Sequence, residues 1–130
     1  MCQLIMIDDN PMEHLIMQKM FDSYGIFPNV EHSMDAKSTI DFLTENLSVI
    51  DQLPDVILLD LNMPNFNGWD FLEHFKKLYQ AFKKHITIYI VSSSVAQEDR
   101  LRSETYPFVR SFLSKPLKRE TLEQLSLLHD

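Results

Sequence analysis

The feature that most constrains this chain is the regular alternation of short apolar runs with longer segments of helical periodicity. Three runs, at residues 4–7, 55–59 and 86–91, are rich in Ile, Leu and Val and nearly continuous in apolar character. Such runs are typical of strands that are covered on both faces of a sheet. Weaker strands are predicted at residues 29–32 and 109–113, nearer the edges of the sheet.

The segments between the strands carry apolar residues at helical spacing. Asn10 followed by Pro11 is a cap and first-turn signature, and Gly25 is a stop signal. One face of this first helix contains Met12, Leu15, Ile16, Lys19 and Met20. Four further helices are predicted from a cap at Ser33 or Asp35 through Leu47, and over residues 68–82, 96–104 and 119–129.

Strand followed by helix, repeated five times, predicts an α/β fold with a parallel sheet. Right-handed crossovers then place helices on both faces, which gives a doubly wound sheet of five strands and five helices. In such folds a ligand binds outside the carboxyl ends of the strands. The residues at those ends are therefore the candidates for a functional site.

Charged and hydroxyl side chains stand at these strand ends. Asp8 and Asp9 follow the first strand, and Asp60 follows the third. Ser92 follows the fourth strand and Lys115 the fifth. Carboxylates that converge repel one another by roughly 1 to 4 kcal/mol per pair at 4 Å, so a cation is expected among them. Carboxylate, carbonyl and water oxygens are the ligands that Mg²⁺ prefers.

These side chains together have the parts for phosphoryl transfer to a carboxylate. Asp60 is the candidate nucleophile, which would form an aspartyl phosphate. The metal and Lys115 would neutralise charge on the transferred group, while the Ser92 hydroxyl and backbone N–H groups would bind its remaining oxygens.

In these residues the sequence resembles the receiver domains of two-component response regulators. The resemblance covers essentially the whole chain in order and spacing. Its motifs are Ile7-Asp8-Asp9-Asn10, Leu59-Asp60-Leu61-Asn62-Met63-Pro64 with Gly68 beyond it, Val91-Ser92-Ser93-Ser94, and Phe112-Leu113-Ser114-Lys115-Pro116.

The resemblance implies a flavodoxin-like receiver fold with strand order 2-1-3-4-5. It also implies phosphorylation of Asp60 by a histidine kinase or a histidine phosphotransfer protein. Mg²⁺ would be bound by Asp9, Asp60 and the backbone carbonyl of Asn62, with Asp8 contributing through water. Lys115 would contact the phosphoryl group.

A conformational switch is implied as well. Ser92 would move toward the phosphoryl oxygens, and Phe112 would turn into the space so vacated. The surface formed by the fourth helix, fifth strand and fifth helix would then change. Ser92 replaces a frequent threonine and Phe112 a frequent tyrosine, while residues 94–110 lack the glycine of many relatives. The Lys115–Pro116 bond is expected to be cis, as in the family.

Composition limits the partners and the compartment. A length of 130 residues fits one domain, so residues 1–130 are expected to form a single receiver domain whose output passes to a separate effector protein. A net charge of −7 argues against direct binding to nucleic acid. No signal-like or membrane-spanning segment is present, which predicts a cytoplasmic protein without membrane insertion.

Two alternatives share parts of this pattern. One is a receiver-like interaction module that accepts no phosphate, but all the expected acids and the lysine are present. The other is a phosphatase of the haloacid dehalogenase type, which also uses an Asp nucleophile and Mg²⁺. That class needs a second Asp two residues after the nucleophile, where this chain has Asn62.

Overall fold

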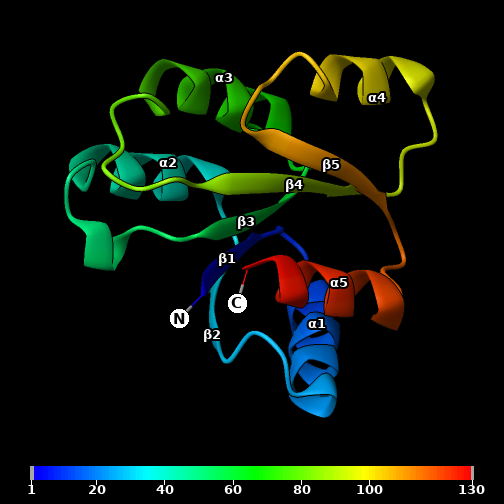
Figure 1. Cartoon of the computed structure of the whole chain (residues 1–130). Coiled ribbons are helices and arrows are strands. Elements are labelled where there is room, and N and C mark those ends of the chain that lie inside the picture. Colours follow the sequence, from blue (N-terminus) through cyan, green and yellow to red (C-terminus); the bar gives the residue numbers. More distant parts are fainter. Residues whose placement is uncertain (1, 130) are drawn as a thin grey trace.

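The computed structural model describes residues 2–129 and shows a five-stranded sheet between two layers of helices (Figure 1). Every pair of neighbouring strands is parallel, and the order is β2-β1-β3-β4-β5. Both the predicted fold class and the strand order implied by the resemblance are therefore confirmed. The strands are β1 Gln3–Ile7, β2 Asn29–Ser33, β3 Val56–Asp60, β4 Thr87–Ser92 and β5 Val109–Ser114.

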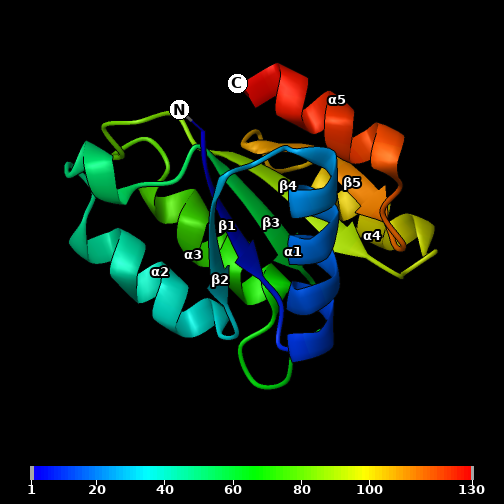
Figure 2. The ribbon, with the colours of Figure 1, turned by 90° about the horizontal axis from the view of Figure 1, so that it is seen from below.

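Helices cover both faces of the sheet. α1 and α5 lie on one face, whereas α2, α3 and α4 lie on the other (Figures 1 and 2). Within residues 2–129, no helix is long and apolar enough to cross a lipid bilayer. The helices are α1 Pro11–Tyr24, α2 Ala36–Glu45, α3 Gly68–Leu78, α4 Gln97–Ser103 and α5 Arg119–His129, and a 3₁₀ turn spans Ile50–Gln52.

The core consists of two apolar clusters separated by the sheet. Successive side chains of a strand point to opposite faces, so Leu59 packs under α2 and α3 whereas Leu58 packs under α1 and α5. Every residue of β3 and β4 is buried, which explains the continuous apolar runs in the sequence. β2 and β5 form the edges and are partly exposed.

The sheet buries a different face of α1 from the one that the apolar residues suggested. Met12 and Leu15 are 58% and 51% exposed. The buried residues of α1 are His14, Met17 and Phe21. His14 is accommodated because its Nε2 lies 2.7 Å from the carbonyl oxygen of Asp8 and its Nδ1 lies 2.7 Å from Nδ1 of His32. Met17 and Phe21 thus pack in the core, and the hydrogen bonds to the loop and to β2 satisfy the one polar side chain among the three buried residues.

Helices α2 and α3 end earlier than predicted, and one leucine of α5 is more exposed than its spacing indicates. α2 ends at Glu45 rather than at Leu47. α3 stops at Leu78, four residues before the predicted end at 82. Phe82 still packs on Phe75, with ring centroids 5.2 Å apart, so its apolar character reflects core packing rather than helix. In α5, Leu122 and Leu125 are buried as their spacing indicates, whereas Leu128 is 55% exposed.

Candidate functional site

Three carboxylates meet at the carboxyl edge of the sheet. Asp8 and Asp9 follow β1, and Asp60 ends the neighbouring strand β3. One carboxylate oxygen from each residue lies within 4.8 Å of the others. Asp8 and Asp60 are 2% and 6% exposed, while Asp9 is open to solvent. The convergence of these acids, expected from the strand ends, is therefore present in the structure.

Local hydrogen bonds hold the first loop in place. Oδ1 of Asp8 accepts a hydrogen bond from the N–H of Asn10 at 2.9 Å. The Asn10 side chain in turn accepts from the N–H of Met12 at 3.0 Å and so caps α1. The start of α1 and the position of Asp8 are thus set by the same short segment.

Gly68 allows the loop after β3 to close on Asp60. Its N–H donates to the carbonyl of Leu61 at 3.2 Å. A Cβ atom at this position would lie 2.5 Å from the carbonyl oxygen of Asp60 and 2.8 Å from Cα of Leu61. Both of these atoms are backbone, so the loop would have to move to admit any side chain.

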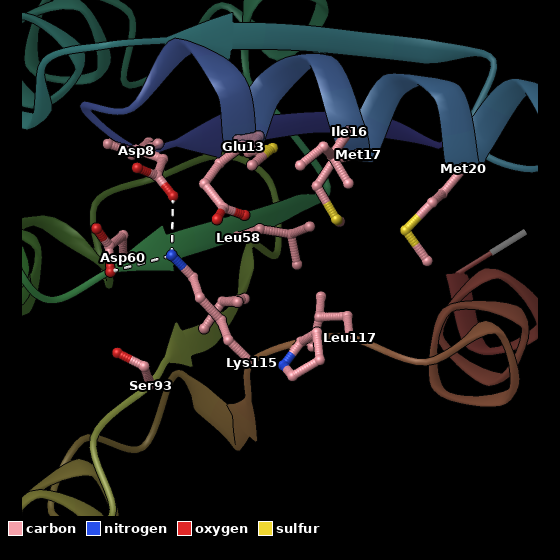
Figure 3. Close-up of a pocket in the computed structure, with 14 residues that line it drawn as sticks. Asp8, Glu13, Ile16, Met17, Met20, Leu58, Asp60, Ser93, Lys115 and Leu117 are labelled. Atoms are coloured by element: carbon pink, nitrogen blue, oxygen red, sulfur yellow. Dashed lines mark hydrogen bonds and ion pairs between the residues drawn. The ribbon is translucent and has the colours of Figure 1, made fainter.

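Lys115 brings a positive charge from the end of β5. Its Nζ lies 3.1 Å from Oδ2 of Asp8 and 3.7 Å from Oδ1 of Asp60 (Figure 3). The backbone N–H of Lys115 donates to the carbonyl of Ser92 at 2.9 Å, which ties this segment to the end of β4. The peptide bond to Pro116 is cis, as the resemblance implied.

The positive charge of Lys115 does not offset the negative charges of the three carboxylates. Burial, and next the charge of Asp8, raise the pKa of Asp60 from 3.8 to about 6, although Lys115 opposes the rise. Burial lowers the pKa of Lys115, but the charge of Asp60 and the hydrogen bond to Asp8 outweigh it, so the pKa lies above its usual value. The ionised form of Asp60 is disfavoured in the protein alone, and a second cation would restore it.

The donor set fits a small divalent cation. Asp8, Asp9 and Asp60 offer hard carboxylate oxygens around one point. The N–H of Asn62 lies 3.4 Å from Oδ1 of Asp60, which places this backbone segment beside the acids. Carboxylates with room for water on the exposed side of Asp9 match the coordination that Mg²⁺ requires.

Of the two residues assigned to the switch, Ser92 ends β4 next to the strand that ends at Asp60, and Phe112 lies on the edge strand β5. Ser92 is fully buried, and its Oγ accepts a hydrogen bond from the N–H of Ser94 at 3.1 Å. Phe112 on β5 is partly buried and packs at the border of the cluster under α2 and α3. The structure thus brings together Asp8, Asp9, Asp60 and Lys115, with the Asn62 backbone beside them.

The site continues into a pocket of about 480 Å³ between α1 and the segment after β5 (Figure 3). Glu13 and Ser93 line it beside the acids, and neither was assigned a role in the site from the sequence. Glu13 stands in the first turn of α1, four residues after Asp9, and its charge contributes to raising the pKa of Lys115. This position in the first turn of the helix that follows Asp9 is the sequence signal that could have indicated Glu13 as a residue of the site. The apolar part of the wall includes Ile16, Met17, Met20, Leu58 and Leu117.

Two curated proteins are similar to this chain in sequence over most of its length. Probable methanogenesis regulatory protein FilR2 of Methanothrix harundinacea is 26% identical over 121 residues, covering 93% of this chain and 76% of FilR2. Sensor histidine kinase CheAY of Helicobacter pylori is 29% identical over 119 residues, covering 92% of this chain but only 14% of CheAY.

A solved structure is also similar to this chain. The response regulator receiver protein of Dyadobacter fermentans is 31% identical, with a TM-score of 0.76, and the match covers 94% of this chain and 95% of that protein. Residues 4–126 also match the sequence model of the response regulator receiver domain. The chain therefore belongs to the response regulator receiver domain family of two-component signalling.

Proposed function

We propose that this receiver domain accepts a phosphoryl group on Asp60 from a phosphohistidine and signals through the resulting change of shape. The observation that carries the proposal is the placement of Asp60. This carboxylate is buried at the end of β3, with Nζ of Lys115 at 3.7 Å and two further carboxylates at cation-binding distance.

The chemistry is a displacement at phosphorus. An oxygen of Asp60 bonds to the phosphorus atom as the bond between phosphorus and the donor histidine nitrogen breaks. The electron pair of that bond stays on the nitrogen. The ammonium of Lys115 binds a phosphoryl oxygen, and backbone N–H groups of the surrounding loops bind others.

Mg²⁺ is the proposed cofactor. Asp9, Asp60 and the backbone carbonyl of Asn62 would hold it, and Asp8 would bind it through water. When bound, it supplies the positive charge that the transferred group requires. The raised pKa of Asp60 supports this assignment, because the protein alone does not stabilise all of its carboxylates in the ionised form.

The proposed partners are a histidine kinase or a histidine phosphotransfer protein upstream and an effector protein downstream. Similarity to a segment of a protein named as a sensor histidine kinase supports the first. We expect residues 1–130 to act as one receiver domain, in the cytoplasm with these partners. The activity proposed is that of a switch that modifies itself, and the family match favours it over a phosphatase.

The proposed switch uses Ser92 and Phe112. Phosphorylation draws the Ser92 hydroxyl toward the phosphoryl oxygens and away from the N–H of Ser94, its present partner. Phe112 then moves into the space left behind. Ser92 and Phe112 lie on neighbouring strands, where Phe112 pairs with Ile90, two residues before Ser92, so the proposed movement spans adjacent parts of the sheet.

Incubation with a phosphorylated histidine phosphotransfer protein or a small acyl phosphate, with Mg²⁺, tests the proposal. Intact-mass measurement should show one phosphoryl adduct on the wild type and none on Asp60→Asn. Asp41→Asn is the control, because Asp41 is an exposed acid on α2 that pairs with Lys37. An adduct that persists in Asp60→Asn, or that fails to form on the wild type with either donor, would refute the proposal.

A further inference from the structure

α4 lacks a side-chain cap of the usual kind and is tied to Ser92 instead. Its N-cap residue, Ala96, offers no side-chain oxygen. Oγ of Ser94 takes over this role, since it accepts from the N–H of Ala96 at 3.2 Å and donates to Oδ2 of Asp99 at 2.6 Å. The N–H of Ser94 donates to Oγ of Ser92. The start of α4 is therefore two hydrogen bonds away from the Ser92 hydroxyl.

The middle of α4 is fastened to β5 by Arg100. The guanidinium carbon of Arg100 lies 4.8 Å from the centroid of the Phe112 ring. Nη2 of the same side chain donates to Oγ of Ser114 at 2.7 Å. Phe112 and Ser114 are two residues apart on a strand, so they point to the same side of β5. One arginine thus contacts two residues on one face of the edge strand.

We propose that Arg100 is a latch that holds Phe112 and β5 against α4 in the present conformation and so sets the energetic threshold of the switch. The proposal rests on the function proposed above. A ring that turns into the core leaves the guanidinium behind, so the contact favours only the starting state. A contact made in one state alone shifts the equilibrium between the two. Arg100 lies outside the motifs that carry the family resemblance.

The chain supplies a matched control. The guanidinium carbon of Arg119 lies 4.8 Å from the centroid of the Tyr24 ring, and its Nε lies 3.3 Å from Oε1 of Glu123. This contact joins α5 to α1, on the opposite face of the sheet from α4 (Figure 1). Arg119→Ala therefore removes the same kind of interaction without touching β5.

Trp69 provides an optical readout. It is the only tryptophan in the sequence. The guanidinium carbon of Arg102, on α4, lies 4.3 Å from the centroid of its ring, and Tyr106 stacks on it with centroids 6.4 Å apart. Because Trp69 itself belongs to α3, its fluorescence reports the position of α4 relative to α3.

The first measurement needs no phosphate. Backbone amide spectra of metal-free wild type, Arg100→Ala and Arg119→Ala are compared at Phe112 and Ser114. We expect shifts or exchange broadening of these two amides in Arg100→Ala only. Unchanged amides at Phe112 and Ser114 in Arg100→Ala would overturn the latch, whatever the outcome of the phosphorylation experiments.

The second measurement titrates each protein with beryllofluoride in Mg²⁺ and follows Trp69 fluorescence together with the same amides. Loss of an exposed cation–π contact and its hydrogen bond should lower the midpoint about fivefold in Arg100→Ala, equivalent to about 1 kcal/mol. Arg119→Ala should stay at the wild-type midpoint. Arg100→Lys keeps the charge but not the planar fork, so an intermediate midpoint is expected.

The outcomes separate the two proposals. Equal midpoints for Arg100→Ala and Arg119→Ala, with a wild type that responds, would overturn the latch and leave the proposed function intact. A wild type that shows no response at any of these probes would contradict the proposed function, and altered Phe112 amides in metal-free Arg100→Ala would then show only that Arg100 holds Phe112 against α4, without a threshold to set. Should Arg100→Ala unfold, Arg100→Lys carries both measurements.

Discussion

Asp60 destabilises the metal-free protein when it is ionised, so Asp60→Asn should make that protein more stable near neutral pH. The side chain is buried beside Asp8, and its pKa is raised from 3.8 to about 6. A difference of about 2.2 pKa units corresponds to about 3 kcal/mol between the ionised and neutral forms. An amide resembles the neutral carboxyl, so about 3 kcal/mol is the upper limit of the stabilisation.

The pH dependence follows from the sign of the shift. A folded-state pKa above the unfolded one means that the folded protein binds more protons between pH 3.8 and about 6. The stability associated with the neutral carboxyl is complete below pH 3.8 and is lost as pH rises through about 6. The increase in the free energy of unfolding caused by Asp60→Asn should therefore be near zero at about pH 4 and reach roughly 1 to 3 kcal/mol at about pH 7.5.

Urea unfolding in the presence of a chelator, at both pH values, measures this difference. Subtracting the free energy of unfolding of the wild type from that of the variant cancels the effect of the titratable groups that the two proteins share. Asp41→Asn, which removes an exposed acid, should change the stability little at either pH. A gain for Asp60→Asn that is the same at both pH values, or a loss of stability near neutrality, would refute the reasoning.

Three further predictions concern other contacts. Gly68→Ala should cost at least about 2 kcal/mol in urea unfolding and abolish phosphorylation, because its Cβ would lie 2.5 Å from a backbone oxygen; a near-neutral result would contradict the geometry. Lys115→Met should raise the pKa of Asp60 above about 6 in an NMR titration of its carboxyl carbon, because the opposing cation is lost; an unchanged pKa would count against this electrostatic account. Tyr89→Phe should cost about 1 kcal/mol at pH 7.5, because it removes the 2.7 Å hydrogen bond to Nε2 of His129. Burial lowers the pKa of His129, so the stability that this residue contributes is complete above pH 6.5 and is lost as pH falls; the free energy of unfolding of the wild type minus that of His129→Gln isolates this contribution, and a difference that grows on acidification would contradict the assignment.

The strand ends explain how far sequence reasoning could reach. Asp8, Asp9, Asp60 and Lys115 follow apolar runs, and parallel strands bring their carboxyl ends to one edge. Their approach within a few ångströms therefore followed from periodicity and topology alone. Residue type then indicated the chemistry, because carboxylates crowded together require a cation.

The rotation of α1 could not be derived in the same way. Apolar residues stand on two faces of α1, and the sheet buries the face of His14, Met17 and Phe21 while Met12, Leu15 and Ile16 stay exposed. The choice depends on partners far along the chain and on the loop, namely His32 on β2 and the carbonyl of Asp8. Side-chain spacing within one helix contains no information about these partners.

The sequence by itself determined the order of the elements, the parallel sheet and the set of charged residues at its edge, because these depend on local periodicity and on the chemistry of single side chains. Tertiary structure alone decided the raised pKa of Asp60, the pocket beside Glu13 and the contact of Arg100 with Phe112. Each of these depends on distances and burial between segments that are remote in sequence. Such distances are set only when the whole core packs.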